Sequence, residues 1–313
     1  MIMIILSGSS NPELATKIAE KLKKRVYFPC TQFADGEIRV QIPISLRKQN
    51  VYIIQSTSPN TNKHIMELFL MTDAVKRASG KETTLIIPYF GYSRQDRKDQ
   101  PRVPISSALI SNLLKISGAD RIVTIDIHSD QQQGFFDGPW DNLYASYVLL
   151  PTIKQLKLPN LVIVSPDKGG TMRANAYAKR IQAEGIAVVY KERDVNLRNI
   201  SKALELIGDV DGKNCLIVDD IIDTGGTIIN AANLLKQRDA KKIIVSSTHG
   251  LFSSNAVQKL HDSVVEKIII TDSIYVEGMK FTNKFKVVSV SKLLSEAIKR
   301  IESGTPLSAG LLD

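Results

Sequence analysis

Short apolar runs alternate with amphipathic stretches along most of the chain, and this pattern predicts strands that alternate with helices. The first apolar run, residues 2–6, is typical of a buried strand. Asn11 and Pro12 then predict a helix start, because Asn is a favoured N-cap and Pro suits the first helical position. Leu14 and Ile18 lie four residues apart and would share the buried face of that helix.

The alternation continues through two consecutive series of similar length, with a break in the order around residues 139–150. Further strands are predicted at residues 51–55, 85–88, 122–127, 161–164, 186–190, 215–218, 243–247, 267–270 and 287–290. Helices are predicted at residues 62–78, 105–116, 172–184, 228–237, 256–261 and 292–301, and another from Pro151 onward.

This order favours an α/β protein with two similar domains, each a mostly parallel sheet flanked by helices. We expect the first domain at residues 1–145, joined by the C-terminal segment 290–313. The second domain would span residues 146–289. In such sheets ligands bind beyond the carboxyl ends of the strands, so the loops at those ends are the places to look for chemistry.

Two carboxylates and a loop of small residues follow the apolar run at residues 216–218. Asp219 and Asp220 come at the carboxyl end of this predicted strand, and the loop at residues 223–227 opens the next helix. Backbone N–H groups of such a loop can bind a phosphate at the helix N-terminus. Carboxylates can hydrogen-bond sugar hydroxyls or hold Mg²⁺ through water. Together they predict a site for a phosphorylated sugar.

A second loop of this kind spans residues 165–171, between a predicted strand and a predicted helix. It implies a second bound anionic group, and Asp167 is placed to face a metal ion. A plain turn of Pro, Asp and Gly fits the loop equally well when it is considered alone. The presence of the sugar-phosphate loop elsewhere in the chain favours the anion site.

Two further loops carry weaker signals. His128, within residues 126–136, follows a strand and is a candidate metal ligand or phosphate donor, although a single His is more often a structural hydrogen-bonding group. Its place beside acids and glutamines at the end of a strand favours a role in a site. Arg94 and Lys98, within residues 94–99, have the charge to clamp a polyphosphate. By composition alone the segment 94–99 is better explained as a solvated, self-neutralising loop.

Lys191, Glu192 and Arg193 begin a polar stretch that runs to about Asn199. Two cations on a long mobile loop are suited to close over a reacting phosphoryl group. An ordinary surface loop is the alternative, and the spacing does not decide between them. The chain has no Gly-x-x-x-x-Gly-Lys-Ser/Thr motif, no Gly-x-Ser-x-Gly motif and no paired-cysteine metal motif, which disfavours a P-loop kinase.

Composition narrows the class further. The chain has 313 residues, 43% hydrophobic and 23% charged, as expected for a soluble globular protein. No apolar run approaches the roughly 20 residues needed to cross a bilayer, and the N-terminus lacks the basic leader of a signal peptide. Cys30 and Cys215 are far apart, so we expect reduced thiols and a cytoplasmic location.

The net charge of +9 implies anionic partners. Aromatic residues make up only 6% of the chain, and no basic segment is interleaved with them, so nucleic acid is a poor candidate. The basic cluster at residues 21–25 ends a helical pattern, where cations suit the helix dipole. Small polyphosphate substrates explain the positive net charge as well as nucleic acid would.

These motifs together closely resemble the ribose-phosphate pyrophosphokinase family, also called phosphoribosyl pyrophosphate synthetases, of the phosphate-regulated class. The resemblance runs nearly end to end. Residues 218–227 are similar to the family's ribose 5-phosphate loop, residues 165–170 to its pyrophosphate loop, and residues 126–139 to its signature. Residues 33–37 and 94–99 are similar to its ATP-binding segments.

The resemblance implies two phosphoribosyltransferase-like domains and a specific reaction. The C1 hydroxyl of ribose 5-phosphate attacks the β-phosphorus of ATP with Mg²⁺ as cofactor, and AMP leaves. The product, 5-phosphoribosyl 1-pyrophosphate, would supply purine, pyrimidine, NAD, histidine and tryptophan synthesis. The chemistry is plausible, because phosphoryl transfer depends chiefly on positioning and charge neutralisation.

The resemblance also assigns residues. It places the ribose 5-phosphate site at Asp219, Asp220, Asp223, Thr224, Gly225, Gly226 and Thr227, the ATP site at Phe33, Asp35, Glu37, Arg94, Gln95 and Asp99, and the pyrophosphate loop at Asp167, Lys168, Gly169 and Gly170. It implies Mg²⁺ near His128 and Asp167, with Lys191 and Arg193 as the catalytic pair. Asp220 is our candidate to accept the C1 hydroxyl proton.

Three residues depart from the family pattern. Glu192 stands where many bacterial members carry Arg, and it lowers the charge of the catalytic loop. Lys168 occupies a place that is usually uncharged, and Gln132 replaces a smaller or apolar residue in the signature. Lys168 would add a contact to phosphate.

The family assembles dimers into hexamers, with phosphate as activator and ADP as inhibitor. Ser45, Arg47 and Ser308 occupy matching regulatory positions, although the tail at residues 303–313 differs in detail.

Two other functions remain as alternatives. A type I phosphoribosyltransferase shares the motif at residues 218–227, but the chain length, the second α/β series and the segment at residues 126–139 favour the synthetase. A non-catalytic associated protein of the family would carry an insertion in the catalytic loop region, and residues 191–212 show none. A nucleic-acid-binding protein is a distant third.

Overall fold

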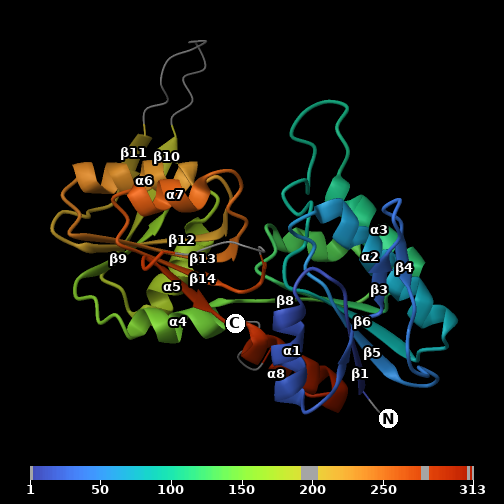
Figure 1. Cartoon of the computed structure of the whole chain (residues 1–313). Helices are drawn as coiled ribbons and strands as arrows, with labels where there is room; N and C mark the ends of the chain where they lie inside the picture. The colour runs from blue at the N-terminus through green and yellow to red at the C-terminus, as the bar shows by residue number, and fades with distance from the viewer. Residues whose placement is uncertain (1–2, 192–203, 276–281, 309–310, 312–313) are drawn as a thin grey trace. The chain divides into compact units, whose positions relative to one another are not determined.

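The computed structural model describes residues 3–191, 204–275, 282–308 and 311, with only the backbone of Lys191 (Figure 1). It divides into two compact units. One consists of Met1–Ala145, Asp272–Glu277 and Ser289–Asp313, and the other of Ser146–Thr271 and Gly278–Val288. Each unit is described separately below.

The N-terminal unit is built on a six-stranded sheet in the order β2-β1-β5-β6-β7-β8, with all neighbouring strands parallel. Its strands are β1 (Met3–Ser7), β2 (Val26–Tyr27), β5 (Asn50–Ile54), β6 (Glu82–Ile87), β7 (Arg121–Ile125) and β8 (Trp140–Leu143). Its helices are α1 (Pro12–Leu22), α2 (Thr61–Arg77), α3 (Ser106–Ser117), the 3₁₀ helix η1 (Asp130–Phe135) and α8 (Ser291–Ser303). A separate antiparallel pair, β3 (Cys30–Gln32) and β4 (Ile38–Val40), completes the unit.

The C-terminal unit repeats this plan with a seven-stranded sheet in the order β11-β10-β9-β12-β13-β14-β15. Its strands are β9 (Leu161–Ser165), β10 (Gly185–Lys191), β11 (Leu204–Ile207), β12 (Asn214–Ile222), β13 (Lys242–Gly250), β14 (Lys267–Thr271) and β15 (Phe285–Val288). Only β10 and β11 pair antiparallel. The helices are α4 (Ser146–Lys154), α5 (Thr171–Ile181), α6 (Gly226–Gln237) and α7 (Ala256–Asp262), with α6 and α7 on one face and α4 and α5 on the other (Figure 1).

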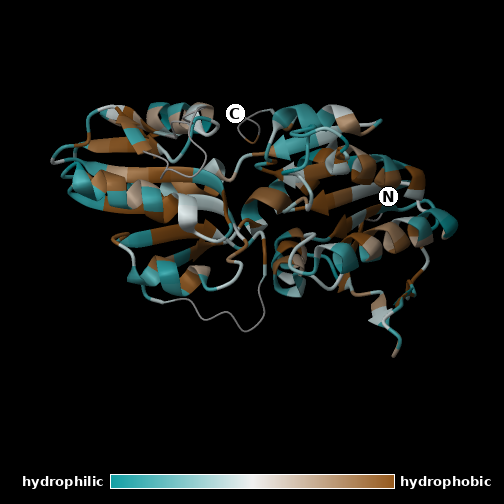
Figure 2. Ribbon diagram, turned by 90° about the horizontal axis from the view of Figure 1, so that it is seen from above, coloured by the Kyte–Doolittle hydropathy of each residue, from teal (hydrophilic) through white to brown (hydrophobic). Residues whose placement is uncertain are grey.

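Burial of the strands explains why these sequences form parallel sheets. All five residues of β9 are buried, as expected for a central strand covered by helices on both faces. Figure 2 shows the same within each unit, since brown strands lie between helices whose surfaces are largely teal. Among the described residues, none of the helices combines the length and the apolar character that a membrane span requires.

Most predicted elements are present, with shifted ends. Asn11 is confirmed as the N-cap of α1, because its Oδ1 accepts the N–H of Leu14 at 3.1 Å. The helix predicted to begin at Pro151 was wrong in its start: α4 begins at Ser146 and contains Pro151. Burial of apolar side chains, such as Leu149, holds the helix together despite the N–H that proline lacks.

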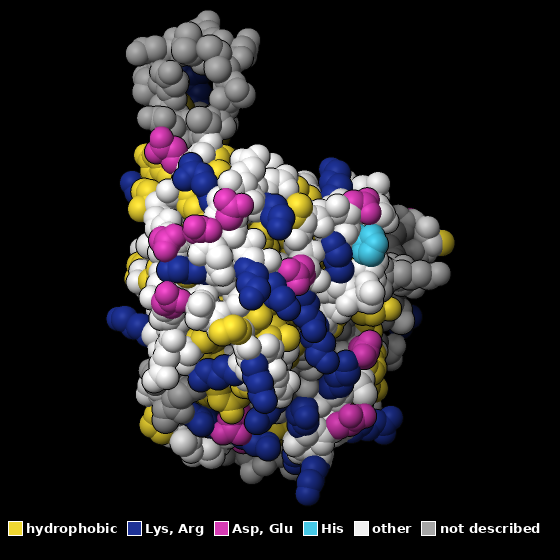
Figure 3. Space-filling view, turned by 90° about the vertical axis from the view of Figure 1, so that its left-hand side faces the viewer, with side chains coloured by type: hydrophobic (Ala, Val, Ile, Leu, Met, Phe, Trp, Pro, Cys, Tyr) yellow, Lys and Arg dark blue, Asp and Glu magenta, His cyan; other side chains and the backbone are white. Residues whose placement is uncertain are grey.

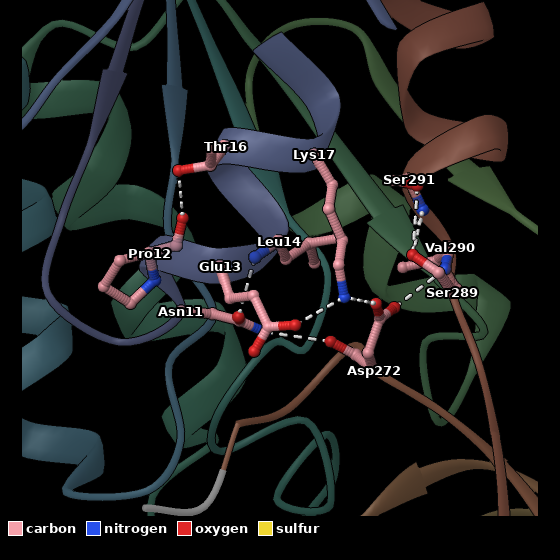
Figure 4. Close-up of polar contacts among 10 residues, drawn as sticks. All are labelled: Asn11, Pro12, Glu13, Leu14, Thr16, Lys17, Asp272, Ser289, Val290 and Ser291. Atoms are coloured by element: carbon pink, nitrogen blue, oxygen red, sulfur yellow. Dashed lines mark hydrogen bonds and ion pairs between the residues drawn. The ribbon is translucent and has the colours of Figure 1, made fainter. Parts of the chain in front are cut away.

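Asp272 connects α1 to the C-terminal part of the chain within the N-terminal unit (Figure 4). Its carbonyl oxygen accepts a hydrogen bond from Asn11 Nδ2 at 2.8 Å, and its Oδ1 accepts the N–H of Val290 at 2.8 Å. Lys17 Nζ lies 2.7 Å from Glu13 Oε1 and 3.7 Å from Asp272 Oδ2. These polar contacts attach the C-terminal chain to the N-terminal unit.

Candidate functional site

The acid pair lies inside β12 rather than in the loop after it. The strand extends through Asp219 and Asp220 to Ile222, and the parallel neighbour β13 pairs with it over the same length. Asp220 is buried and Asp219 nearly so. The N–H of Asp220 donates to Asp219 Oδ1 at 2.9 Å, which fixes the orientation of the first carboxylate.

The loop after β12 ends at a helix N-terminus, as the sequence predicts. Gly225 is the N-cap of α6 and has φ of +79°, a left-handed conformation that favours glycine. An added Cβ there would also approach Leu260 to 3.3 Å. Thr224, Gly226 and Thr227 are exposed, so the loop presents its hydroxyls and backbone to solvent and can receive a phosphate.

The loop between β9 and α5 has the second arrangement expected of an anion site. Asp167 Oδ1 accepts the N–H of Gly170 at 3.0 Å, and Ser165 Oγ donates to the carbonyl of Asp167 at 2.6 Å. A Cβ at Gly170 would lie 2.7 Å from Ser165 Oγ, so the turn requires glycine. Asp167, Lys168 and Gly169 are exposed at its tip.

The two loops meet at the topological switch point of this sheet. β9 and β12 are adjacent and parallel, and the helices that follow them, α5 and α6, cover opposite faces. Arg173 on α5 contacts the acid pair of β12, because its Nη1 lies 3.2 Å from Asp220 Oδ1 and 3.5 Å from Asp219 Oδ1. Arg173 was not predicted from the sequence, because its partner Asp220 lies 47 positions away and no local motif connects the two.

Electrostatics at this switch point favour a bound cation. Burial raises the pKa of Asp219 well above its ordinary value, and the neighbouring carboxylate of Asp220 raises this pKa further. Asp167 acts in the same direction, whereas the Arg173 guanidinium lowers the pKa. A cation bound beside these carboxylates would lower the pKa of Asp219, as the Arg173 guanidinium already does.

In the N-terminal unit the segment after β7 is tightly held. Asp126 has φ of +41°, and its Oδ2 accepts the N–H of Ala145 at 3.1 Å. His128 follows and is exposed. Gln132 is fully buried; its Nε2 donates to the carbonyl of Ser93 at 3.0 Å.

Gln132 also accepts a hydrogen bond from Ser107 on α3. The polar residue at position 132 is thus accommodated by hydrogen bonds to two other segments. It also fixes the segment at residues 126–136 beside the start of the segment at residues 94–99.

The predicted ATP-binding residues lie on two exposed segments of this unit. Phe33, Asp35 and Glu37 form the turn between β3 and β4, where the N–H of Phe33 donates to the carbonyl of Glu37 at 2.8 Å. Phe33 is 50% exposed, so its ring face is accessible for stacking. Arg94, Gln95 and Asp99 are exposed on the loop before α3, and Gln95 accepts a hydrogen bond from Ser106 at 2.7 Å.

Comparisons with known proteins agree with this geometry. The N-terminal domain of ribose phosphate pyrophosphokinase matches residues 3–118, and the phosphoribosyl synthetase-associated domain matches residues 195–311. The ribose-phosphate pyrophosphokinase of Vibrio parahaemolyticus is 45% identical over 310 residues, covering 98% of both chains. That of Aquifex aeolicus is 46% identical over 307 residues, covering 97% of both. The chain belongs to the ribose-phosphate pyrophosphokinase family.

A solved structure confirms the fold of this family member. Phosphoribosylpyrophosphate synthetase from Mycobacterium smegmatis matches with a TM-score of 0.92 and 37% identity, over 97% of this chain and 100% of that chain. The predicted family, α/β fold and enzyme class, a ribose-phosphate diphosphokinase, are therefore confirmed.

The remaining predicted residues of this pyrophosphokinase are only partly described. Lys191 ends β10, and its side chain, together with Glu192 and Arg193, lies outside the described residues. The predicted regulatory residues Ser45 and Ser308 are exposed.

The carboxylates at the switch point suit the Mg²⁺ that the pyrophosphokinase family implies. No group of three or more His, Cys, Asp or Glu side chains in the described part of the chain forms a complete metal site. Mg²⁺ keeps several waters and is commonly held by one or two carboxylates together with substrate phosphates. Exposed Asp167 and the adjacent carboxylates of Asp219 and Asp220 at the end of β12 fit that mode of binding.

The surface of the C-terminal unit is rich in cations. Figure 3 shows Lys and Arg side chains gathered across the middle of one face, with acidic side chains scattered among them. Exposed cations of this unit include Lys154, Lys157, Lys236, Lys241 and Lys242. Lys241 and Lys242 lie at the start of β13, so these cations are at the opposite edge of the sheet from the loops that follow β9 and β12.

Proposed function

We propose that this pyrophosphokinase transfers diphosphate from ATP to the C1 hydroxyl of ribose 5-phosphate, giving 5-phosphoribosyl 1-pyrophosphate and AMP. The observation that carries the proposal is the switch point of the C-terminal unit. There an acid pair, held by Arg173, lies between two loops that each open a helix. The acids suit the hydroxyls of a sugar, and the two loops suit two phosphate groups.

Ribose 5-phosphate binds at β12 and the loop after it. Asp219 and Asp220 accept hydrogen bonds from the ribose hydroxyls, and the backbone N–H groups and hydroxyls of residues 223–227 bind the 5-phosphate. This is supported by the burial of the acids and by the exposure of Thr224 and Thr227 at the start of α6.

In this proposal ATP binds through the exposed segments of the N-terminal unit at residues 33–37 and 94–99. The loop at residues 167–170 of the C-terminal unit provides for a pyrophosphate group. The ring of Phe33 stacks on adenine, and Asp35 and Glu37 accept hydrogen bonds from the nucleoside. Arg94, Gln95 and Asp99 bind the remainder of the nucleotide. The family's ATP site draws residues 33–37 from a neighbouring subunit, so the functional form is a homo-oligomer in which dimers assemble into hexamers.

In this proposal Asp167 would bind Mg²⁺ at the pyrophosphate loop of the C-terminal unit, and His128 would bind Mg²⁺ at the N-terminal unit. When bound, Mg²⁺ neutralises charge on the polyphosphate and on the group being transferred. Lys191 and Arg193 supply further positive charge to the transferred group. Inorganic phosphate as activator and ADP as inhibitor, acting near Ser45, Arg47 and Ser308, complete the proposal.

The transfer balances without any further reactant. A bond forms between the C1 oxygen of ribose 5-phosphate and the β-phosphorus of ATP, and the bond from that phosphorus to the α,β-bridging oxygen breaks. The C1 hydroxyl proton is released, and Asp220 is the nearest candidate to accept it, since it belongs to the pair that binds the sugar. AMP leaves with the bridging oxygen.

The assay for this function incubates the protein with ATP, Mg²⁺ and ribose 5-phosphate and measures AMP. AMP that forms in step with the loss of ribose 5-phosphate supports the proposal. ADP as the product contradicts it. If the protein binds ribose 5-phosphate but forms no AMP, it is instead a non-catalytic associated protein.

Lys168 offers a small, specific prediction. Its side chain is exposed at the tip of the loop at residues 165–170, so it adds one solvent-screened contact to phosphate. Exposed ion pairs contribute up to about 1 kcal/mol, and Lys168→Ala is therefore expected to raise the KM for ATP by about two- to fivefold. Lys179→Ala, exposed on α5 beyond the loop, is the matched control. An unchanged KM in Lys168→Ala rules out the contact.

A further inference from the structure

Arg173 links α5, the helix that follows the loop at residues 165–170, to the acid pair of β12. It belongs to the first turn of α5, two residues after the helix begins, and so moves with the loop at residues 165–170. Its guanidinium nevertheless reaches β12, where Nη1 lies 3.2 Å from Asp220 Oδ1 and 3.5 Å from Asp219 Oδ1. The arginine side chain is 22% exposed, and the carboxylate side chains 16% and 8%, so this is a largely desolvated ion pair.

The geometry explains why a cation is needed here. Two adjacent carboxylates in the interior of a sheet repel each other, and burial removes the water that would otherwise screen them. Asp167 adds a third negative charge nearby. A single nitrogen, Nη1, contacts both carboxylates. Arginine suits a partly desolvated site better than lysine, because a guanidinium is more weakly hydrated than an ammonium and stays charged.

We propose that Arg173 is a positioning residue for ribose 5-phosphate. Its guanidinium holds the carboxylates of Asp219 and Asp220 in the orientation that accepts the ribose hydroxyls, and it does so from the helix that carries the pyrophosphate loop. The inference rests on the proposed function in that it takes ribose 5-phosphate as the ligand of the acid pair. Arg173 acts through the acids and needs no contact with the substrate.

Calorimetric binding of ribose 5-phosphate, without ATP, tests this directly. Arg173→Gln is expected to weaken binding about tenfold or more, since hydrogen bonds to charged groups are among the stronger ones. Arg173→Lys should recover part of the loss. Arg180→Gln is the matched control on the same helix, because Arg180 Nη1 donates to the neutral Ser146 Oγ at 2.6 Å; its affinity should equal that of the parent protein.

A double-mutant cycle separates positioning from a general structural effect. If Arg173 acts through Asp220, the double variant Arg173→Gln/Asp220→Asn should bind ribose 5-phosphate about as weakly as Asp220→Asn alone. Losses that add, or an Arg173→Gln affinity equal to that of the parent, would overturn the inference. If Arg173→Gln does not fold, as judged by circular dichroism, Arg173→Lys decides: an affinity equal to that of the parent overturns the inference, and a loss of several-fold supports it.

Measuring both ribose 5-phosphate binding and AMP release on the same samples distinguishes a failure of this inference from a failure of the proposed function. A parent protein that binds ribose 5-phosphate with an affinity dependent on Arg173, yet releases no AMP from ATP, would overturn the proposed reaction and support the role of Arg173. A parent protein that does not bind ribose 5-phosphate would overturn both.

Discussion

Replacing Asp220 by Asn is expected to lower the rate of AMP formation by about 10²- to 10³-fold, the usual scale for losing one preorganised polar group of an active site. The protein should stay folded with undiminished stability. Asp219 and Asp220 are adjacent and buried, and Asp220 raises the pKa of Asp219, so the ionised pair costs stability at neutral pH. Removing one charge relieves that repulsion while it removes an acceptor for the sugar and a partner of Arg173.

The rate of AMP formation and the thermal unfolding midpoint must be measured on the same preparations, to show that activity falls while stability does not. Asp209→Asn is the matched control, since Asp209 is an exposed acid of the same unit and pairs with Lys213 at 3.0 Å on the surface. The control should keep its activity. An Asp220→Asn protein as active as this control would remove Asp220 from the site. One that is inactive because it is unfolded would show that the acid is structural.

Replacing Glu67 by Ala is expected to give the largest loss of stability, about 3 kcal/mol in the free energy of unfolding. Glu67 is 2% exposed on α2. Its carboxylate accepts three hydrogen bonds, from the Ser9 N–H at 2.9 Å, Ser9 Oγ at 2.6 Å and Gln55 Nε2 at 2.7 Å. Alanine leaves these donors without their acceptor and opens a cavity beside them.

Glu67 and its hydrogen-bond partners lie at the switch point of the N-terminal sheet. β1 and β5 are the counterparts in the N-terminal sheet of β9 and β12, because in both sheets the helices after the central pair lead outward in opposite directions. At this switch point Gln55 Oε1 accepts from Ser10 Oγ at 2.7 Å, and Glu67 holds Ser9. A carboxylate of the chain itself thus binds the loop whose counterpart in the C-terminal unit is proposed to bind phosphate.

Guanidinium unfolding followed by circular dichroism measures the effect of Glu67→Ala. Glu20→Ala, an exposed acid on α1, is the control and should change the free energy of unfolding by less than about 0.5 kcal/mol. Equal unfolding midpoints for the two variants would show that the network around Glu67 contributes little.

Much of the fold could be predicted because parallel strands buried on both faces are long apolar runs. β9 is the plainest example, since every residue in it is apolar except the terminal Ser165. β8 was missed because Trp140-Asp141-Asn142-Leu143 mixes polar and apolar residues at a sheet edge. The short pair β3 and β4 was also missed, since its strands have three residues each and little burial.

Parts of the candidate site could be predicted where the backbone conformation or the available space requires glycine. Gly225 has a positive φ at the N-cap of α6, and Gly170 has no room for a Cβ, so both loops are visible as small-residue motifs. Long-range contacts leave no such local signal. The pairing of Arg173 with Asp220 spans 47 positions, and the bond from Ser9 to Glu67 spans 58.

The most direct test of the proposed reaction follows the phosphorus atoms of ATP into the products. ATP labelled with ³²P at the α or at the β position is incubated with Mg²⁺, ribose 5-phosphate and the protein, and the products are separated. Transfer of diphosphate predicts the β label in the sugar product and the α label in AMP. An unlabelled sugar product, with both labels recovered in ADP, would contradict the proposal, because only the γ-phosphoryl group would then have moved.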